Sequence, residues 1–436
     1  MKRVLYNKLI AWKNSESRKP LLLQGARQVG KTYLVSQFAE NEYKNFIYLN
    51  FEQKSALNAL FEDDLSPDKI IENISLYLGK KIEEENTLLF FDEIQVSAKA
   101  LTSLKYFYEQ KPTLHIIAAG SLLGVSFGKT TSFPVGKVNF LNLYPMSFLE
   151  FMNAIGEELL VDKILNINGI ESFPQSIHNK LISQIKLYLF IGGMPEAVQD
   201  YIIRKDVFSV RKIQLDILDS YQRDFSKYTD KNQAVKISEL WRSIPFQLAR
   251  ENKKFKYSEV RKGGRSSKYE QTIEWLQKAG LINVAYNVSI PNLPLSAFSD
   301  MSKFKIYLND NGLLGAMLDV SSSLIVDPKN SLFEQFNGVF IENFVAAELT
   351  TYNDEKLFYW TSKSDAEVDF LIQRNNRVYP VEVKSGMSRN LKSLQSYISK
   401  YNPNLSYRIS PRNFLQSDKF INMPLYLISF LNKKDN

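Results

Sequence analysis

The sequence contains no cysteine and only two histidines, His115 and His178, among its 436 residues. Without cysteine, the chain has no disulfide framework, no thiol nucleophile and no cysteine-ligated zinc site. A histidine-dependent hydrolase would rest on two isolated histidines without a triad context, so we expect both to be structural or surface residues. These absences exclude several large classes of enzymes and metalloproteins.

Long apolar runs are missing as well. No stretch approaches the ~18 apolar residues that a membrane span needs, and the first twelve residues lack the apolar run of a signal peptide. We therefore expect a cytoplasmic protein with no membrane association. Hydrophobic residues make up 44% and charged residues 23% of the chain, which is typical of globular proteins, and the length favours two to four domains.

The net charge of +8 is unevenly distributed. Residues 204–268 hold 17 basic and 8 acidic residues, an excess of nine that accounts for the whole imbalance. Such an excess is the electrostatic footprint of a protein that binds DNA or another polyanion. A solvated helical face explains it equally well, and the sequence leaves both interpretations open.

A loop with glycine at both ends follows the first apolar run. It fits the phosphate-binding pattern G-x-x-x-x-G-K-[ST] without a mismatch. Glycine allows the loop to bend round an anion, and the N-terminus of the following helix adds positive potential. We expect Lys31 to neutralise phosphate oxygens of ATP and the Thr32 hydroxyl to hold Mg²⁺. The predicted ATP-binding residues are Gly25, Ala26, Arg27, Gln28, Val29, Gly30, Lys31 and Thr32.

A second apolar run ends in Asp92 and Glu93. Such a run is typical of a central parallel strand, and ligands collect at the carboxyl ends of these strands. We expect Asp92 to hold Mg²⁺ directly or through water, and Glu93 to orient or deprotonate the attacking water. The next apolar run ends at Ser121, which either senses the γ-phosphate or caps the following helix.

The middle of the chain is predicted to contain two different segments. A mainly helical lid is predicted first, with a backbone break at Gly192-Gly193-Met194-Pro195. Short helices, a basic turn and two strands follow, in the order of a winged helix. If this module binds DNA, the helix at 266–279 enters the major groove; winged helices also serve as packing or dimerisation modules. The predicted phosphate contacts are Arg261, Lys262, Arg265 and Lys268.

The C-terminal segment carries a second group of charged residues, on two strands that form a predicted hairpin. Side chains alternate along strands, so Glu367, Asp369, Glu382 and Lys384 lie toward one face. Two carboxylates and a lysine on one face are able to hold Mg²⁺ or Mn²⁺ and to activate a water for phosphodiester attack. A half-exposed hairpin with a charged outer face has the same pattern, and the alternative stays open.

Seven motifs together carry a family resemblance: residues 24–32, 91–95, 119–121, 144–148, 192–195, 367–370 and 381–384. They resemble a large group of uncharacterised prokaryotic AAA-type ATP-binding proteins with a C-terminal region of unknown function. The resemblance covers almost the whole chain and implies a Mg-ATP site at Lys31, Thr32, Asp92 and Glu93. It also implies a tail similar to the PD-(D/E)XK nuclease fold. The family's helix-acid, D and E-x-K positions are Glu342, Asp369, Glu382 and Lys384.

The resemblance also implies roles for residues of the tail: Glu342, Asp369 and Glu382 would bind a metal ion, and Asp369, Glu382 and Lys384 would be catalytic.

One position departs from the family. Relatives commonly have Gly-Arg where this chain has Gly136-Lys137, and lysine lacks the planar fork suited to γ-phosphate oxygens. A trans-acting arginine is therefore not placed there.

The predicted fold class is α/β. A doubly wound P-loop core (1–155) is followed by a helical lid (156–234), a winged helix (235–320) and a nuclease-like domain (321–436). The leading hypothesis is an ATPase whose nucleotide state controls a DNA-directed C-terminal half, with a metal-dependent nuclease as one form of that half. The alternatives are a nucleotide-dependent switch that recruits a partner and a DNA-binding regulator. A homo-oligomer is compatible with each of them.

Overall fold

The computed structural model describes residues 1–120, 133–167, 172–250, 254–321, 337–353, 356–363, 366–386 and 391–432. The chain divides into two compact units, residues 2–144 and residues 145–436, and each is described by itself. The first unit thus ends at Tyr144, eleven residues before the predicted border at 155. Among the described helices, none combines the length and the apolar character needed to span a bilayer.

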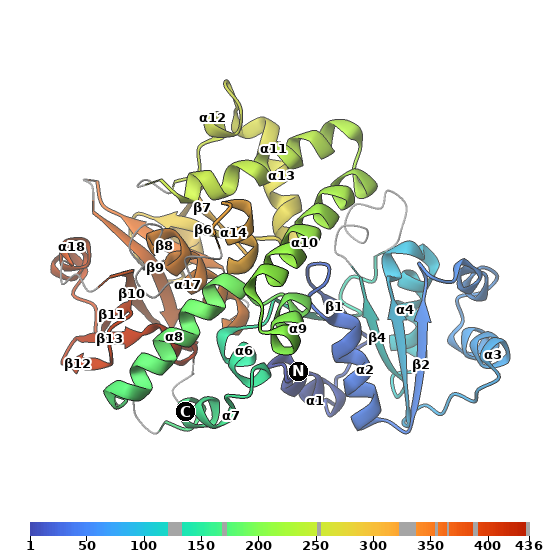
Figure 1. Cartoon of the computed structure of the whole chain (residues 1–436). Helices are drawn as coiled ribbons and strands as arrows, with labels where there is room; N and C mark the ends of the chain where they lie inside the picture. Colours follow the sequence, from blue (N-terminus) through green and yellow to red (C-terminus); the bar gives the residue numbers. More distant parts are fainter. Residues whose placement is uncertain are drawn as a thin grey trace. The chain divides into compact units, whose positions relative to one another are not determined.

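A five-stranded parallel sheet forms the centre of residues 2–144, in the order β2-β3-β4-β1-β5 (Figure 1). Strands β3 and β4 are buried along their whole length, as expected from their continuous apolar runs. The parallel sheet confirms the α/β P-loop core. The strands are β1 (Leu21–Gln24), β2 (Asn45–Asn50), β3 (Thr87–Asp92), β4 (His115–Ala119) and β5 (Asn139–Asn142).

Helices cover both faces of this sheet. Alternate strand residues such as Leu22, Leu89 and Ile116 form one core with η1 (Ser55–Phe61), α3 (Pro67–Leu78) and α4 (Ala98–Gln110). On the other face lie α1 (Leu5–Lys13) and α2 (Lys31–Glu42). The result is a three-layer arrangement in which the loop before α2 lies at the carboxyl ends of the strands.

An eight-stranded mixed sheet organises much of residues 145–436, in the order β12-β13-β11-β10-β9-β8-β6-β7. The predicted hairpin of β9 and β10 is confirmed, with Arg374 opposite Arg377. Asn375 and Asn376 both have positive φ, 47° and 56°, as a two-residue turn that follows the strand twist requires. The strands are β6 (Ile282–Val288), β7 (Ser299–Leu308), β8 (Leu357–Thr361), β9 (Glu367–Arg374), β10 (Arg377–Val383), β11 (Ser406–Ser410), β12 (Leu415–Ser417) and β13 (Phe420–Pro424).

The expected border at 320/321 runs through this sheet. Helices α11 (Lys231–Leu248), α12 (Tyr257–Val260) and α13 (Ser266–Lys278) precede the β6–β7 hairpin in the predicted order. Strand β6 also pairs in parallel with β8, from Ala285 with Leu357 to Val288 with Trp360. Because β6 is buried almost throughout, it needs a neighbour on each side, so the hairpin belongs to the same sheet as the C-terminal strands.

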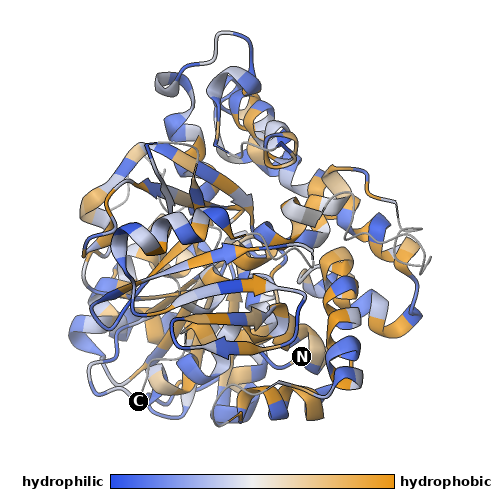
Figure 2. Cartoon of the chain, turned by 90° about the vertical axis from the view of Figure 1, so that its left-hand side faces the viewer, coloured by the Kyte–Doolittle hydropathy of each residue, from blue (hydrophilic) through white to orange (hydrophobic). Residues whose placement is uncertain are grey.

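Helices α17 (Asn337–Asn353) and α18 (Lys392–Tyr401) lie on opposite faces of the sheet. Helix α18 packs through Leu394 and Tyr397 on Val368 and Trp360. Most helices carry both hydrophilic and hydrophobic residues (Figure 2), as expected for helices with one buried side. The remaining helices are α6 (Phe148–Ala154), α7 (Glu158–Leu165), α8 (Gln175–Ile191), α9 (Pro195–Arg204), α10 (Val207–Tyr228), α14 (Asn311–Met317) and the 3-10 segment η4 (Leu425–Asn432).

The glycine pair at 192–193 forms the predicted break between α8 and α9, and close packing explains it. Gly192 has a φ of 76°, and a Cβ there would lie 2.3 Å from a carboxylate oxygen of Asp310. A Cβ on Gly193 would lie 2.1 Å from the carbonyl oxygen of Met146. The Gly193 N–H donates to Asp310 at 2.5 Å, and the same carboxylate accepts from the N–H of Leu313 at 2.9 Å. Side chains at these two positions would break this junction.

Candidate functional site

The loop between β1 and α2 has the backbone of a phosphate cradle. Gly25 and Gly30 have φ values of 146° and 92°, which side-chain-bearing residues rarely adopt. A Cβ on Gly25 would lie 2.1 Å from the carbonyl oxygen of Leu143. Helix α2 begins at Lys31, so its free N–H groups face the loop.

The Lys31 ammonium is folded back onto its own loop. It donates to the carbonyl oxygens of Gly25 at 2.9 Å and Ala26 at 2.8 Å. Burial lowers the pKa of Lys31 to about 8, although the carboxylates of Glu93 and Asp92 act in the opposite direction. The lysine is therefore held at the mouth of the cradle by weak acceptors that an anion is able to replace.

Arg3 braces the same loop and was not predicted from the sequence. Its buried guanidinium donates to the carbonyl oxygen of Val29 at 2.9 Å and to that of Tyr144 at 2.5 Å. Arg27, also in the loop, pairs with Glu52 at 3.6 Å. No local pattern marks Arg3, because its role depends on the fold bringing the start of the chain to the loop.

Asp92 lies at the end of β3, beside two side-chain hydroxyl groups. Its Oδ2 accepts from the Thr32 hydroxyl at 2.9 Å and from the Tyr48 hydroxyl at 2.9 Å. Asn50 in turn donates to the Tyr48 oxygen at 3.0 Å. The Thr32 hydroxyl and the Asp92 carboxylate thus lie together as predicted, and this oxygen donor set fits Mg²⁺. Tyr48 was missed, because its place is visible only once β2 is known to lie beside β3.

Glu93 is held by a side-chain amide. It has a φ of 52°, and its carboxylate accepts a short hydrogen bond from the Gln95 amide nitrogen. A Cβ on Gly120 would lie 2.2 Å from the Gln95 oxygen, so the glycine leaves room for Gln95. This oxygen is buried and has no hydrogen-bond partner within the described part of the chain. Ser121, the predicted sensor, lies outside the described residues.

The remaining sequence candidates in this unit have structural partners. Lys137, where the proteins that this sequence resembles commonly have arginine, pairs with Glu109 at 3.1 Å. His115 is buried against the rings of Trp12 and Tyr43, and burial lowers its pKa to about 4. In the second unit, His178 contacts the Tyr426 hydroxyl through Nδ1 at 2.9 Å. Both histidines are structural, as expected.

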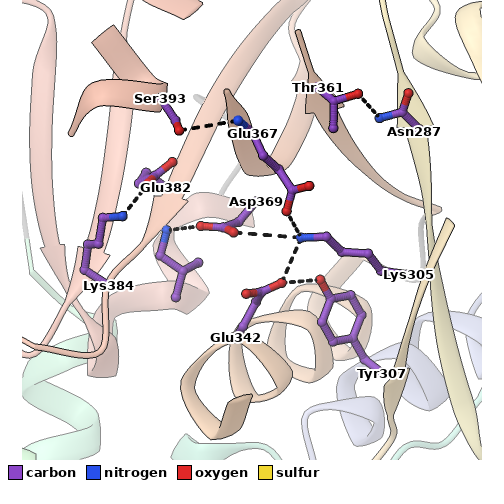
Figure 3. A network of polar contacts seen from close by, with 11 residues as sticks. Asn287, Lys305, Tyr307, Glu342, Thr361, Glu367, Asp369, Glu382, Lys384 and Ser393 are labelled. Carbon is purple, nitrogen blue, oxygen red and sulfur yellow. Dashed lines mark hydrogen bonds and ion pairs between the residues drawn. The ribbon is translucent and has the colours of Figure 1, made fainter. Parts of the chain in front are cut away.

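A second constellation lies in residues 145–436, where β7, β9, β10 and α17 meet (Figure 3). At its centre is Lys305, whose side chain is 0% exposed. Its ammonium lies 2.6 Å from Glu367, 3.1 Å from Glu342 and 3.9 Å from Asp369. The Tyr307 hydroxyl also donates to Glu342, at 2.6 Å. Alternation along β7 places Lys305 and Tyr307 on one side of the strand, the signal by which this lysine was detectable.

The predicted tail residues gather here, but their oxygens are turned to protein donors. Asp369 accepts from the backbone N–H of Val383 at 2.7 Å, and Glu382 pairs with Lys384 at 2.6 Å. Within the described part of the chain, no three acidic or histidine side chains are grouped to hold a metal ion. Glu342, Asp369 and Glu382 are therefore near one another without forming the predicted metal site, because Lys305 stands among the carboxylates.

A basic hollow of about 560 Å³ lies between α11, the glycine turn 263–264 and α13. Three of the four predicted phosphate contacts line it, together with Lys236 and one acid, Glu239. Arg265 precedes α13 and is exposed. The exposed side of α13 also carries two acids, and Glu274 pairs with Lys278 at 2.6 Å. The three lining residues from the predicted set are Arg261, Lys262 and Lys268.

Comparison with protein families matches three segments of the chain. Residues 17–152 match the family described as AAA domain. Residues 182–324 and 337–427 match two families, each described as a domain of unknown function (DUF8612 and DUF4143). The middle match spans the expected border at 234/235. The first unit thus has a P-loop ATPase-like fold, and the families of the remaining segments assign no activity.

Two similar curated proteins are described as uncharacterized. The chain is 29% identical over 246 residues to the uncharacterized protein MJ1637 of Methanocaldococcus jannaschii, which covers 50% of this chain and 49% of that one. It is 31% identical over 93 residues to the uncharacterized protein Rv2008c of Mycobacterium tuberculosis, 20% of each chain. The chain therefore spans about half the length of the first relative and a fifth of the second.

Two solved structures are similar at low sequence identity. The Walker-type ATPase paby2304 of Pyrococcus abyssi aligns with a TM-score of 0.45 and 16% identity, over 72% of this chain and 94% of that chain. The Aeropyrum pernix ORC1 protein, solved in complex with DNA, aligns with a TM-score of 0.30 and 13% identity, over 72% and 90%.

Proposed function

We propose that residues 2–144 bind ATP together with Mg²⁺ and hydrolyse it. The observation that carries this proposal is the meeting of Lys31, Thr32 and Asp92 at the carboxyl ends of the parallel strands, with the Thr32 hydroxyl 2.9 Å from Asp92. Thr32 and Asp92 would hold Mg²⁺, which when bound neutralises phosphate charge and orients the γ-phosphate. The AAA-domain match over residues 17–152 supports the same assignment.

The protein's own groups divide the work. The loop N–H groups and the start of α2 cradle the phosphates, and the Lys31 ammonium exchanges its two carbonyl acceptors for phosphate oxygens. Glu93 accepts a proton from the attacking water. For this step its carboxylate has to leave the Gln95 amide, so Gln95 is a positioning residue for Glu93.

Two substitutions test this assignment. Lys31→Ala is expected to abolish ATP binding, measured with a fluorescent nucleotide. Glu93→Gln is expected to keep binding and to lower turnover by about 10²–10³-fold, because the base is lost while the cradle is intact. Lys99→Ala, which removes an exposed ion pair with Glu62 in the same unit, is the matched control. Wild-type turnover in both site variants would refute the ATPase assignment.

A second proposal concerns DNA. We propose that the C-terminal half binds the DNA backbone through the basic hollow and that the nucleotide state controls this binding. Support comes from the lining of Lys236, Arg261, Lys262 and Lys268 against a single acid, and from the excess of nine basic residues in 204–268. Phosphate contacts explain this composition better than base reading, because α13 also exposes Glu270 and Glu274.

Fluorescence anisotropy with duplex DNA, single-stranded DNA and RNA tests this proposal, in ATP and in ADP. Lys262→Ala with Lys268→Ala is expected to weaken binding about equally for all sequences and to reduce the salt slope by roughly two. Lys278→Ala, whose partner is Glu274, serves as the control. Unchanged affinity in the double variant would refute the hollow as the binding site. DNA binding that ignores the nucleotide would instead favour a DNA-binding regulator.

A further inference from the structure

The acidic cluster of β7, β9, β10 and α17 already contains a cation. We propose that the Lys305 ammonium is the resident cation of this cluster and occupies the place where a nuclease-like fold would hold a divalent metal ion. The residues present do not fit that metal, so the domain keeps the nuclease-like arrangement without metal chemistry. This inference concerns the tail alone and does not depend on the proposed ATPase activity.

The Lys305 ammonium occupies the space between the carboxylates of the cluster. The ammonium is fully buried and lies within ion-pair distance of carboxylates from two different elements, Glu367 on β9 at 2.6 Å and Glu342 on α17 at 3.1 Å. The Tyr359 ring lies 5.0 Å from the same nitrogen. A divalent ion among these carboxylates would meet the ammonium at close range in a desolvated pocket, where like charges repel strongly.

The Lys305 side chain keeps its proton and its positive charge. Burial by itself lowers the pKa of this ammonium, but the carboxylates of Glu342, Glu367 and Asp369, with Tyr307, outweigh burial and hold the pKa well above its usual value. Tyr307 adds a second donor to Glu342. The lysine therefore supplies one positive charge that these three acids share.

The E-x-K residues are satisfied by protein groups at one oxygen of Glu382 and not at the other. Lys384 donates to Glu382 Oε1 at 2.6 Å, and the Val383 N–H donates to Asp369 Oδ2 at 2.7 Å. Glu382 Oε2 is buried and has no hydrogen-bond partner within the described part of the chain. A metal bound in this cluster would be expected to contact this oxygen. Glu382→Gln is therefore one of the variants in the tests.

A direct measurement uses Mn²⁺ as the probe, followed by electron paramagnetic resonance on nucleotide-free full-length protein. Asp92→Asn is introduced first so that the P-loop site does not contribute. No stoichiometric Mn²⁺ binding is expected below ~1 mM. Binding of one equivalent that disappears in Asp369→Asn or Glu382→Gln would overturn the proposal, because the metal would then share the cluster with Lys305.

A variant gives the complementary test. Lys305→Met removes the resident cation and leaves the buried Glu342 and the partly exposed Asp369 and Glu367 without their lysine, so Tm is expected to fall by about 5–10 °C in metal-free buffer. With Asp92→Asn present in both proteins so that the P-loop site does not contribute, millimolar Mn²⁺ is expected to restore part of that loss in Lys305→Met and to leave the Tm of the protein with Lys305 unchanged. An equal rise in the two proteins, or no fall in the variant, would contradict the proposal.

Lys384→Met is the matched control, because the same substitution removes a pair with Glu382 whose lysine is 30% exposed. It is expected to lower Tm less than Lys305→Met does and to show no Mn²⁺ rescue. If Lys305→Met does not fold, Lys305→Arg keeps the charge and is compared with wild type in the Mn²⁺ titration. Stoichiometric Mn²⁺ uptake by Lys305→Arg, lost on adding Glu382→Gln, would count against the proposal.

Discussion

Two places in the described part of the chain combine a lysine with carboxylates, and they use the same residue types in opposite ways. In the loop site, the Lys31 ammonium bonds to two backbone carbonyls, and Asp92 is held by the hydroxyls of Thr32 and Tyr48. In the cluster, the Lys305 ammonium bonds directly to Glu342 and Glu367. A charged side chain with neutral partners is able to pair with a charged ligand. A charged side chain in an ion pair within the protein already has an opposite charge beside it.

The difference also separates a binding site from a structural one. Carboxylates at the strand ends of residues 2–144 keep an acidic charge that a divalent cation is able to share. The carboxylates around Lys305 already share one positive charge from the protein, and their sequence motif does not reveal this. A motif therefore predicts where side chains gather, and their partners decide what they do.

The largest expected effect distinguishes the two aspartates. Asp92→Asn is expected to lower ATP turnover by about 10²–10³-fold, because the carboxylate beside Thr32 loses its charge. Asp369→Asn is expected to leave turnover unchanged within error. Steady-state ATPase assays over a range of Mg²⁺ concentrations measure both. Equal losses in the two variants would break the comparison, since the cluster would then take part in ATP chemistry.

A buried carboxylate without a lysine sharpens the comparison further. Glu348 on α17 accepts from the Phe148 N–H at 2.8 Å, and burial raises its pKa to about 8, with a smaller effect from Glu150. Its folded-state pKa lies above the unfolded value, so its stabilising contribution is complete below pH ~4.5 and is lost as the pH rises to about 8.

Glu348→Gln is therefore expected to flatten this pH dependence and to stabilise the protein at pH 8 by roughly 2–4 kcal/mol. Urea unfolding between pH 5 and pH 8.5 measures it. Glu158→Gln, at an exposed position of α7, is expected to leave the pH profile as in the wild type. A Glu348→Gln profile parallel to the wild type would show that this carboxyl does not titrate in the range.

Tyr48→Phe tests whether a neutral donor prepares Asp92. Losing the hydroxyl that contacts Asp92 at 2.9 Å is expected to raise the Mg²⁺ concentration needed for half-maximal turnover by roughly 10-fold, as for other residues that orient a metal ligand. ATPase assays at varied Mg²⁺ measure the shift, and Tyr77→Phe, on the exposed side of α3, is the control. An unchanged Mg²⁺ requirement would remove Tyr48 from the site.

The smallest expected effect concerns the partly exposed pair of the cluster. Lys384→Met is expected to lower the free energy of unfolding by about 1–2 kcal/mol, less than Lys305→Met, because it leaves the buried Glu382 carboxylate without its lysine but removes a lysine that is itself 30% exposed. Urea denaturation gives the value. A loss as large as that of Lys305→Met would mean that both lysines carry the cluster and that Lys305 has no special position.

Local patterns predicted much of the first site. The loop from Gly25 to Thr32 and the acids at Asp92 and Glu93 are contiguous motifs whose backbone requirements show in the sequence. Arg3 and Tyr48 were not predicted, because their roles depend on the order of strands and on the path of the first residues. Gln95 belongs to the motif at residues 91–95, but its hydrogen bond to Glu93 depends on the left-handed backbone at Glu93.

In the second unit, the hairpin of β9 and β10 and the face shared by Glu367 and Asp369 followed from alternation. Lys305 was not predicted, because a lysine within an apolar strand shows its partner only when β7, α17 and β9 are brought together. The border at 320/321 was misplaced for a related reason. Alternation identifies β6 and β7 as a hairpin, but the parallel pairing of β6 with β8 joins strands about 70 residues apart, and no local signal encodes it.

The junction at Asp310 limits how the chain is divided for experiment. One carboxylate ties the break before α9 to the start of α14, across 117 residues of sequence. A fragment that stops at residue 234 would leave the Gly193 N–H buried without its acceptor, and one that starts at residue 235 would keep the acid and lose its donor. We therefore expect that the helical segment and the mixed sheet do not fold as separate fragments, and that a deletion series cut at 234/235 reports misfolding instead of function.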